Sequence, residues 1–225
     1  PGPPLWPHQQ EAVDALVMAC GDAERATAVM ACGTGKTRTA AATVAALAER
    51  SVVNRILIVV PFLELITQTL REWRDVLGHT GLGRVVAVCS DKDVLRDHQP
   101  ELHAQHAAVT TSAQELARLT AGPGRVTVAA TYASLPVIAS AHDAHGVPMW
   151  DLIIADEAHR SAGRADKASG MIHSNVFIPA SRRLYLTATP KIITGASEDA
   201  VSMDDTKIYG EVAYRLGFSR AITLG

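Results

Sequence analysis

One eight-residue segment constrains the fold of this chain more than any other. Its sequence is Met30-Ala31-Cys32-Gly33-Thr34-Gly35-Lys36-Thr37. Residues 27–30 predict a short buried strand, whereas residues 36–48 are rich in alanine, contain no glycine or proline, and predict a helix. A glycine-rich turn between a buried strand and a helix gathers backbone N–H groups at the positive end of the helix dipole, which favours a bound phosphate. The segment therefore predicts a phosphate-binding loop.

The side chains that end this loop suit a nucleoside triphosphate. Lys36 is expected to reach the β- and γ-phosphates, and the Thr37 hydroxyl is expected to bind Mg²⁺. The rest of the phosphate cradle would be formed by Cys32, Gly33, Thr34 and Gly35. The motif G-x-x-x-x-G-K-[ST] begins with glycine, whereas this chain has Met30 there. The alternative interpretation is a chance glycine-rich turn before a helix.

Composition indicates a folded globular chain whose net charge does not attract nucleic acid. Hydrophobic residues make up 48% of the 225 residues, and the formal net charge is −2. A nucleic-acid partner would therefore have to be held by a local patch or by backbone donors. The cysteines, Cys20, Cys32 and Cys89, are odd in number and lack C-x-x-C spacing, which favours reduced thiols over disulfides or a zinc site. The sequence shows neither a membrane-spanning run nor a signal-peptide pattern, so we expect a cytoplasmic protein.

Segments typical of strands and helices alternate along most of the chain. Apolar runs predict strands at residues 55–60, 84–90, 109–111, 125–131, 150–155 and 183–188. Helical spacing of apolar residues predicts helices that begin near Pro7 and cover residues 63–77, 112–119 and 134–144. This alternation predicts an α/β fold with a mostly parallel central sheet and helices on both faces.

The alternation weakens in two places. Residues 91–105 are polar, and His98, His103 and His106 have a spacing that could gather a metal. Because no cysteine or second ligand cluster lies nearby, a solvated helix face is the favoured interpretation there. From residue 192 the alternation stops, and the sequence predicts a loop at 197–205 and then a short apolar segment. We therefore expect a nucleotide-binding domain at residues 1–191 and a C-terminal tail or linker at residues 192–225.

An acidic pair follows one of the predicted buried strands. Asp156 and Glu157 come directly after residues 152–155, so they should lie at the carboxyl edge of the sheet, where the phosphate loop also lies. Asp156 could hold Mg²⁺ there, while Glu157 orients and deprotonates the attacking water. Taken alone, the pair would be read as a solvated turn. Together with Lys36 and Thr37, it predicts a Mg²⁺-dependent nucleoside-triphosphate site.

The order of these motifs resembles the superfamily 2 helicases and translocases of the DEAD/DEAH-box type. Asp156-Glu157-Ala158-His159 matches the second motif of that family, and Leu186-Thr187-Ala188-Thr189-Pro190 resembles its third. The two nucleic-acid motifs are resembled by Pro61-Phe62-Leu63-Glu64-Leu65-Ile66-Thr67-Gln68 and by Thr131-Tyr132-Ala133-Ser134-Leu135. Pro7-His8-Gln9-Gln10 occupies the place of an adenine-reading glutamine. Because the second motif ends in His159, the resemblance is closer to bacterial DEAH-type proteins and restriction-enzyme motor subunits.

This resemblance implies a RecA-like lobe that uses ATP and Mg²⁺. It implies that Gln9 reads adenine, and that His159, Thr187 and Thr189 couple the γ-phosphate to movement along nucleic acid. It also implies that backbone groups at Pro61, Phe62, Thr131 and Tyr132 hold phosphates of one strand, without reading sequence. The alternatives are that Thr187 only ends a strand and that His159 only starts a helix.

Part of the pattern of such motors is missing from this sequence. Those motors have a second lobe, whose arginine accelerates phosphoryl transfer by about 10³–10⁵-fold. No arginine-rich motif follows Pro190, since Arg215 and Arg220 are isolated. We therefore expect this chain to be the first lobe of a nucleic-acid-dependent ATPase, a DNA helicase or translocase, and to be nearly inactive alone. The alternatives are an ATP-switched nucleic-acid-binding module and the motor subunit of a restriction or anti-phage defence system.

Overall fold

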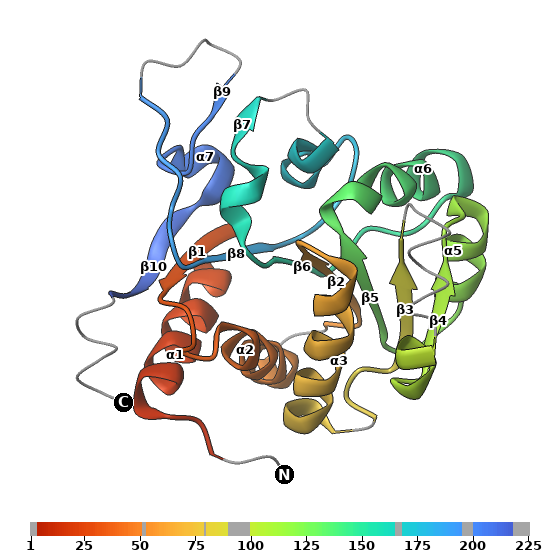
Figure 1. Ribbon diagram of the computed structural model, residues 1–225, viewed down its shortest axis with the longest axis horizontal. Coiled ribbons are helices and arrows are strands. Elements are labelled where there is room, and N and C mark those ends of the chain that lie inside the picture. Colours follow the sequence, from red (N-terminus) through yellow and green to blue (C-terminus); the bar gives the residue numbers. More distant parts are fainter. Residues whose placement is uncertain are drawn as a thin grey trace.

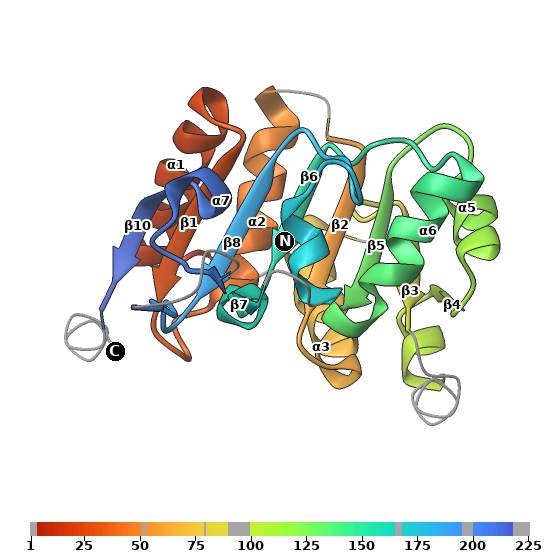
Figure 2. The same ribbon diagram turned by 90° about the horizontal axis from the view of Figure 1, so that it is seen from above.

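Eight parallel strands form the central sheet of the computed structural model, which describes residues 4–50, 53–78, 80–89, 100–164, 168–194 and 200–217. Their order is β10-β1-β8-β6-β2-β5-β3-β4, which Figure 2 shows from left to right. The strands are β1 (Arg25–Met30), β2 (Arg55–Val60), β3 (Arg84–Val88), β4 (Ala107–Thr110), β5 (Val126–Thr131), β6 (Leu152–Ala155), β8 (Arg183–Thr187) and β10 (Glu211–Leu216). Every pairing in this sheet is parallel. Two short strands, β7 (Gly163–Arg164) and β9 (Ala200–Val201), form a separate antiparallel pair.

Helices cover both faces of this sheet (Figure 1). Helices α1 (Pro7–Asp22), α2 (Lys36–Arg50) and α3 (Leu63–Leu77) pack on one face, where their apolar side chains form one core with the sheet. On the other face, α5 (Ala113–Thr120), α6 (Leu135–His145) and α7 (Thr206–Tyr209) contribute to a second core, with the 3₁₀ turns η1 (Tyr132–Ser134), η2 (Ala158–Ser161) and η3 (Ala168–His173). The predicted α/β fold is therefore confirmed.

The interior of the sheet follows the sequence pattern closely. Strand β2 is a run of β-branched and leucine residues, and five of its six positions are buried because helices cover both faces. Helix α3 spans the predicted residues 63–77, with its five buried side chains on one face. The next residue is Gly78, whose φ of 75° lies in the region that favours glycine.

The sequence pattern did not predict α7 and β10. Residues 192–225 were expected to form a tail or linker, but β10 within that segment pairs with β1 and extends the main sheet. The reason is its position at the sheet edge. Three of its six residues, Glu211, Val212 and Arg215, are exposed, so β10 lacks the apolar run of an interior strand. That residues 192–225 also lead to a second lobe stays a prediction.

The structure describes most of the histidines and cysteines that the sequence suggested as possible metal ligands or disulfide partners. His98 lies outside the described residues, and His103 and His106 are exposed. No group of three histidine, cysteine or acidic residues could hold a metal ion within the described ranges. Cys20, Cys32 and Cys89 form no disulfide within the part of the chain that the structure describes. Across the same described ranges, none of the helices has the length and apolar character needed to cross a membrane.

A buried polar cluster attaches α7 to the sheet. The Arg25 guanidinium on β1 donates to the carbonyl oxygen of Ile208 at 2.8 Å and to that of His173 at 2.7 Å. The His173 ring contacts the Tyr185 hydroxyl at 3.0 Å and packs edge-on against Tyr209. Burial, and secondarily nearby arginine charges, lower the pKa of His173 to about 4. The folded protein therefore holds this imidazole in its neutral form.

Because of this shift, His173 is expected to make the protein less stable in acid. Between pH 6.5 and 4 the unfolded chain takes up a proton at His173 that the folded protein does not, so the free energy of unfolding falls as the pH falls. The loss should reach up to about 3 kcal/mol over this interval. Urea unfolding of wild type and His173→Gln across this range measures it, with the exposed His145→Gln as the control. Equal pH slopes for wild type and His173→Gln would contradict the assignment.

Candidate functional site

The predicted motifs meet at one edge of the sheet. The phosphate loop follows β1, the acidic pair follows β6, and Thr189 follows β8, which lies between those two strands. Because the three strands are parallel, their carboxyl ends reach the same edge. The topology therefore brings together residues that are more than a hundred positions apart in the sequence.

Two glycines give the phosphate loop its shape. Gly33 has a φ of 80° and Gly35 a φ of 82°, a region that other residues rarely adopt. The loop is closed internally, since the Thr34 hydroxyl donates to the carbonyl oxygen of Ala31 at 2.7 Å. Cys32 is exposed within it. Helix α2 begins directly afterwards at Lys36, as the motif predicted.

The start of α1 packs on this loop. The side-chain amide of Gln9 donates to the carbonyl oxygen of Thr34 at 3.1 Å, and its oxygen accepts from the Trp6 N–H at 3.0 Å. The His8 ring lies 3.1 Å from the same carbonyl oxygen, a contact that the sequence analysis did not predict. These two hydrogen bonds hold the Gln9 side chain beside the loop. Its role in reading adenine stays a prediction.

The two loop glycines are expected to differ in their tolerance of alanine. A Cβ at Gly35 would lie 2.2 Å from the Gln9 amide nitrogen, whereas a Cβ at Gly33 would have no neighbour within 4 Å. Both substitutions strain a positive φ by about 1–2 kcal/mol, but only Gly35→Ala also displaces Gln9. Gly35→Ala should therefore lower the free energy of unfolding more than Gly33→Ala, as measured by urea denaturation. Equal losses in the two variants would show that the Gln9 contact does not constrain the loop.

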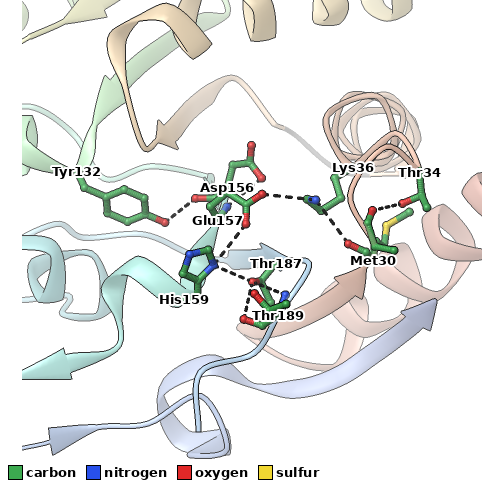
Figure 3. A network of polar contacts seen from close by, with 10 residues as sticks. Met30, Thr34, Lys36, Tyr132, Asp156, Glu157, His159, Thr187 and Thr189 are labelled. Carbon is green, nitrogen blue, oxygen red and sulfur yellow. Dashed lines mark hydrogen bonds and ion pairs between the residues drawn. The ribbon is translucent and has the colours of Figure 1, made fainter. Parts of the chain in front are cut away.

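Lys36 and Glu157 form the centre of the site (Figure 3). The Lys36 ammonium lies 3.5 Å from Glu157 Oε1 and 3.5 Å from the carbonyl oxygen of Met30. The side chains of Lys36 and Glu157 are only 10% and 25% exposed. A phosphate group entering the loop would compete with Glu157 for the lysine, because both are anions that the ammonium can bind.

The geometry of the acidic turn is fixed by several backbone contacts. The Asp156 N–H donates to the carbonyl oxygen of Val59 on β2 at 2.8 Å, and the Tyr132 hydroxyl donates to the carbonyl oxygen of Asp156 at 2.8 Å. Glu157 has φ 47° and ψ 50°, a left-handed conformation that is uncommon for a residue other than glycine. Such strain is typical of functional sites.

The electrostatics of Asp156 suit a cation. Burial, and secondarily the negative charge of Glu157, raise the pKa of Asp156 to about 6. A divalent cation would relieve both causes, since it supplies positive charge beside the buried carboxylate. Carboxylate and hydroxyl oxygens are the ligands that Mg²⁺ prefers, and Asp156 and Thr37 provide one of each. The residues present therefore fit the predicted metal.

The residues predicted to couple the site to movement also lie together. His159 Nδ1 lies 3.3 Å from Glu157 Oε2 and 3.1 Å from the Thr187 hydroxyl. That hydroxyl oxygen accepts the Thr189 N–H at 3.3 Å. A continuous polar network thus joins the acidic turn to the segment after β8 (Figure 3).

The residues predicted to contact nucleic acid differ in how exposed their side chains are. Phe62, which follows Pro61, is 52% exposed, and the Arg160 guanidinium lies 4.4 Å from its ring centroid. Thr131 and Tyr132 are buried, and the Thr131 hydroxyl contacts that of Ser134 at 2.8 Å. The side chains of Thr131 and Tyr132 therefore face the interior, so any contact with a strand would have to use the backbone or neighbouring residues.

Comparison with known proteins agrees with this arrangement. A family model described as "Type III restriction enzyme, res subunit" matches residues 3–192. The type ISP restriction-modification enzyme LlaGI, solved as a nuclease-deletion mutant with a DNA substrate mimic, is 32% identical over 98% of this chain, with a TM-score of 0.76. LlaBIII, an ATP-dependent type ISP enzyme bound to DNA, is 28% identical over 99% of this chain, with a TM-score of 0.73.

The chain spans only 20% and 16% of the lengths of these two enzymes. The helicase domain of Hef from Pyrococcus furiosus shares the fold, with a TM-score of 0.59 and 19% identity over 90% of this chain and 37% of that one. No curated protein sequence matches the chain. The family model covers most of the chain and ends just after the third motif. The chain therefore belongs to the family of the res subunit of type III restriction enzymes, and its fold is that of the first lobe of superfamily 2 helicases.

Proposed function

We propose that this chain is the Mg-ATP-binding lobe of a motor that hydrolyses ATP in response to DNA. The observation that carries the proposal is the 3.5 Å contact between Lys36 of the phosphate loop and Glu157 of the acidic turn. That contact joins the two halves of a phosphoryl-transfer site, which depends on positioning and charge stabilisation. The sequence relation to LlaBIII, an ATP-dependent restriction-modification enzyme, supports the same activity.

Each residue of the site has a distinct task in this proposal. Lys36 binds the β- and γ-phosphates, and the backbone of residues 32–35 surrounds them. Thr37 and Asp156 would hold Mg²⁺, which when bound neutralises charge that develops on the phosphates. Glu157 accepts a hydrogen bond from the attacking water and takes up its proton. Gln9 would contact adenine at the edge of the loop.

The network of His159, Thr187 and Thr189 would carry the state of the γ-phosphate to the nucleic-acid surface. The segments at Pro61–Phe62 and Thr131–Tyr132 would contact one strand of the nucleic acid through backbone groups. DNA is the proposed partner because LlaBIII was solved bound to DNA and LlaGI in complex with a DNA substrate mimic. A second RecA-like lobe, encoded outside this sequence, would supply the missing arginine. We place the protein in the cytoplasm, where free thiols are common.

Two other functions remain distinguishable from this one. A motor subunit of a restriction or anti-phage defence system is favoured by the type ISP relatives, and a nuclease motif in the full-length protein would support it. A module that uses ATP only as a switch would bind nucleic acid in an ATP-dependent way with little turnover.

The test is ATP hydrolysis by the full-length protein with duplex DNA, single-stranded DNA or RNA. We expect ATP turnover that requires Mg²⁺ and increases at least about tenfold when DNA is added. The analogy is the increase in rate when an arginine is added to an otherwise complete phosphoryl-transfer site. Turnover that no nucleic acid stimulates would contradict the proposed motor. Stimulation by RNA alone would contradict the proposed partner.

The 225 residues alone are expected to release almost no phosphate from Mg-ATP, even with DNA. They lack the arginine of the second lobe, which is worth about 10³–10⁵ in rate. Phosphate release by the purified lobe, compared with the full-length protein at equal concentration, measures this difference. Strong DNA-stimulated turnover by the lobe alone would make Arg215 and Arg220 the first candidates for that arginine; Arg220 lies outside the described residues.

A further inference from the structure

An exposed pair of side chains lies next to the site and takes no part in the reaction described above. The Arg160 guanidinium stacks on the Phe62 ring, with its central carbon 4.4 Å from the ring centroid. Phe62 is 52% exposed and Arg160 is exposed. A cation–aromatic contact at such an exposed position contributes little to stability. Packing of the core therefore does not explain the pair.

The pair connects two segments that carry proposed functions. Phe62 follows β2, in the segment proposed to contact the nucleic-acid strand. Arg160 lies in η2, the turn that follows the acidic pair, and its N–H donates to the carbonyl oxygen of Glu157 at 3.0 Å. A displacement of Arg160 would therefore act on the peptide group of Glu157.

The acidic turn is held from two sides. His159 contacts Glu157 and Thr187 on the nucleotide side, whereas the next residue, Arg160, contacts Phe62. The turn begins with the left-handed backbone of Glu157, which persists only where its surroundings enforce it. The position of the Glu157 carboxylate thus depends on contacts on both sides of the turn.

The charge of Arg160 remains available to an anion. Within the part of the chain that the structure describes, no carboxylate forms an ion pair with Arg160. A guanidinium stacked on a ring keeps the N–H groups along its edge free, and these match the oxygens of a phosphate.

We propose that Arg160, held flat on Phe62, binds a phosphodiester of the DNA strand and transmits this contact through its backbone to Glu157. Arg160 is thus a positioning residue that makes DNA binding and nucleotide binding depend on each other. The inference rests on the proposed function and adds to it a specific route between the two sites.

The test measures the affinity of the full-length protein for a fluorescent DNA duplex, with and without the Mg²⁺ complex of a non-hydrolysable ATP analogue. The ratio of the two dissociation constants is the coupling factor, and linkage requires DNA to change nucleotide affinity by the same factor. Arg160→Ala should reduce the coupling factor by at least about threefold, and should lower the slope of log affinity against log salt by about one because one phosphate contact is lost.

Two further variants separate charge from stacking. Phe62→Leu keeps the arginine but removes the ring, so it should reduce the coupling factor while the salt slope changes less than in Arg160→Ala. Arg118→Ala removes another exposed arginine, on α5, and should change neither quantity. Thermal unfolding of each variant, expected to match wild type, shows that the fold is retained.

The outcomes distinguish this inference from the function on which it rests. If wild type shows coupling and Arg160→Ala keeps it in full, the route through Arg160 is wrong, whatever happens to the salt slope, and the proposed function stands. A wild type whose DNA affinity does not respond to nucleotide also overturns the inference. A wild type that does not bind DNA overturns both.

Discussion

Glu157→Gln in the full-length protein is expected to lower kcat for ATP hydrolysis by about 10²–10⁴-fold, the usual contribution of a general base. Glutamine has nearly the same shape as glutamate but cannot accept the proton of the attacking water. Nucleotide should still bind, because Lys36, Thr37 and Asp156 are intact. Binding should even tighten, since the neutral amide no longer competes with phosphate for the Lys36 ammonium, now 3.5 Å from Glu157.

Steady-state hydrolysis and fluorescent-nucleotide titration together measure these two effects. Glu115→Gln is a matched control, because this exposed glutamate lies on α5 and pairs with Arg118. A kcat for Glu157→Gln within about threefold of wild type, equivalent to ~0.7 kcal/mol in the barrier, would exclude Glu157 as the base.

Lys36→Ala is expected to weaken Mg-ATP binding by about 1–3 kcal/mol, the range for a hydrogen bond to a charged group. In dissociation constants this is about 5–150-fold. The variant also leaves Asp156 without a positive charge that lowers its pKa, so its carboxyl should become still harder to ionise. Both effects act against binding of Mg-ATP.

Titration of a fluorescent ATP analogue against wild type and Lys36→Ala tests this expectation. Lys207→Ala is the control, because that lysine is exposed on α7. Equal affinities of wild type and Lys36→Ala would remove Lys36 from the site.

The sequence predicted best those parts of the fold whose residue types are determined by a single physical requirement. Interior strands such as β2 are apolar along their whole length because both faces are covered, so their runs are recognisable. The tight turn before α2 was predictable because its glycines mark positions of positive φ, which the structure has at Gly33 and Gly35. The strands and helices predicted between α1 and β8 all have boundaries within a few residues of those expected.

Features that depend on long-range packing could not be predicted from the sequence. Strand β10 is half exposed and lacks an apolar run, so its place beside β1 follows only from the folded sheet. The left-handed backbone of Glu157 depends on contacts with other elements, since local sequence does not favour it. The inward orientation of Tyr132 could not be predicted for the same reason. Its hydroxyl donates to the carbonyl oxygen of Asp156, 24 positions away. No local pattern signals such a contact.

The most direct test of the proposed site is an experimental structure of the full-length protein with Mg²⁺ and a non-hydrolysable ATP analogue. We expect the phosphates to lie in the loop of residues 32–37, with the Lys36 ammonium bonded to the β- and γ-phosphate oxygens in place of its contact with Glu157. Mg²⁺ should be bound by Thr37 and, directly or through water, by Asp156, with a water molecule between Glu157 and the γ-phosphate. Phosphates bound elsewhere, with Lys36 still paired to Glu157, would contradict the proposed ATP site.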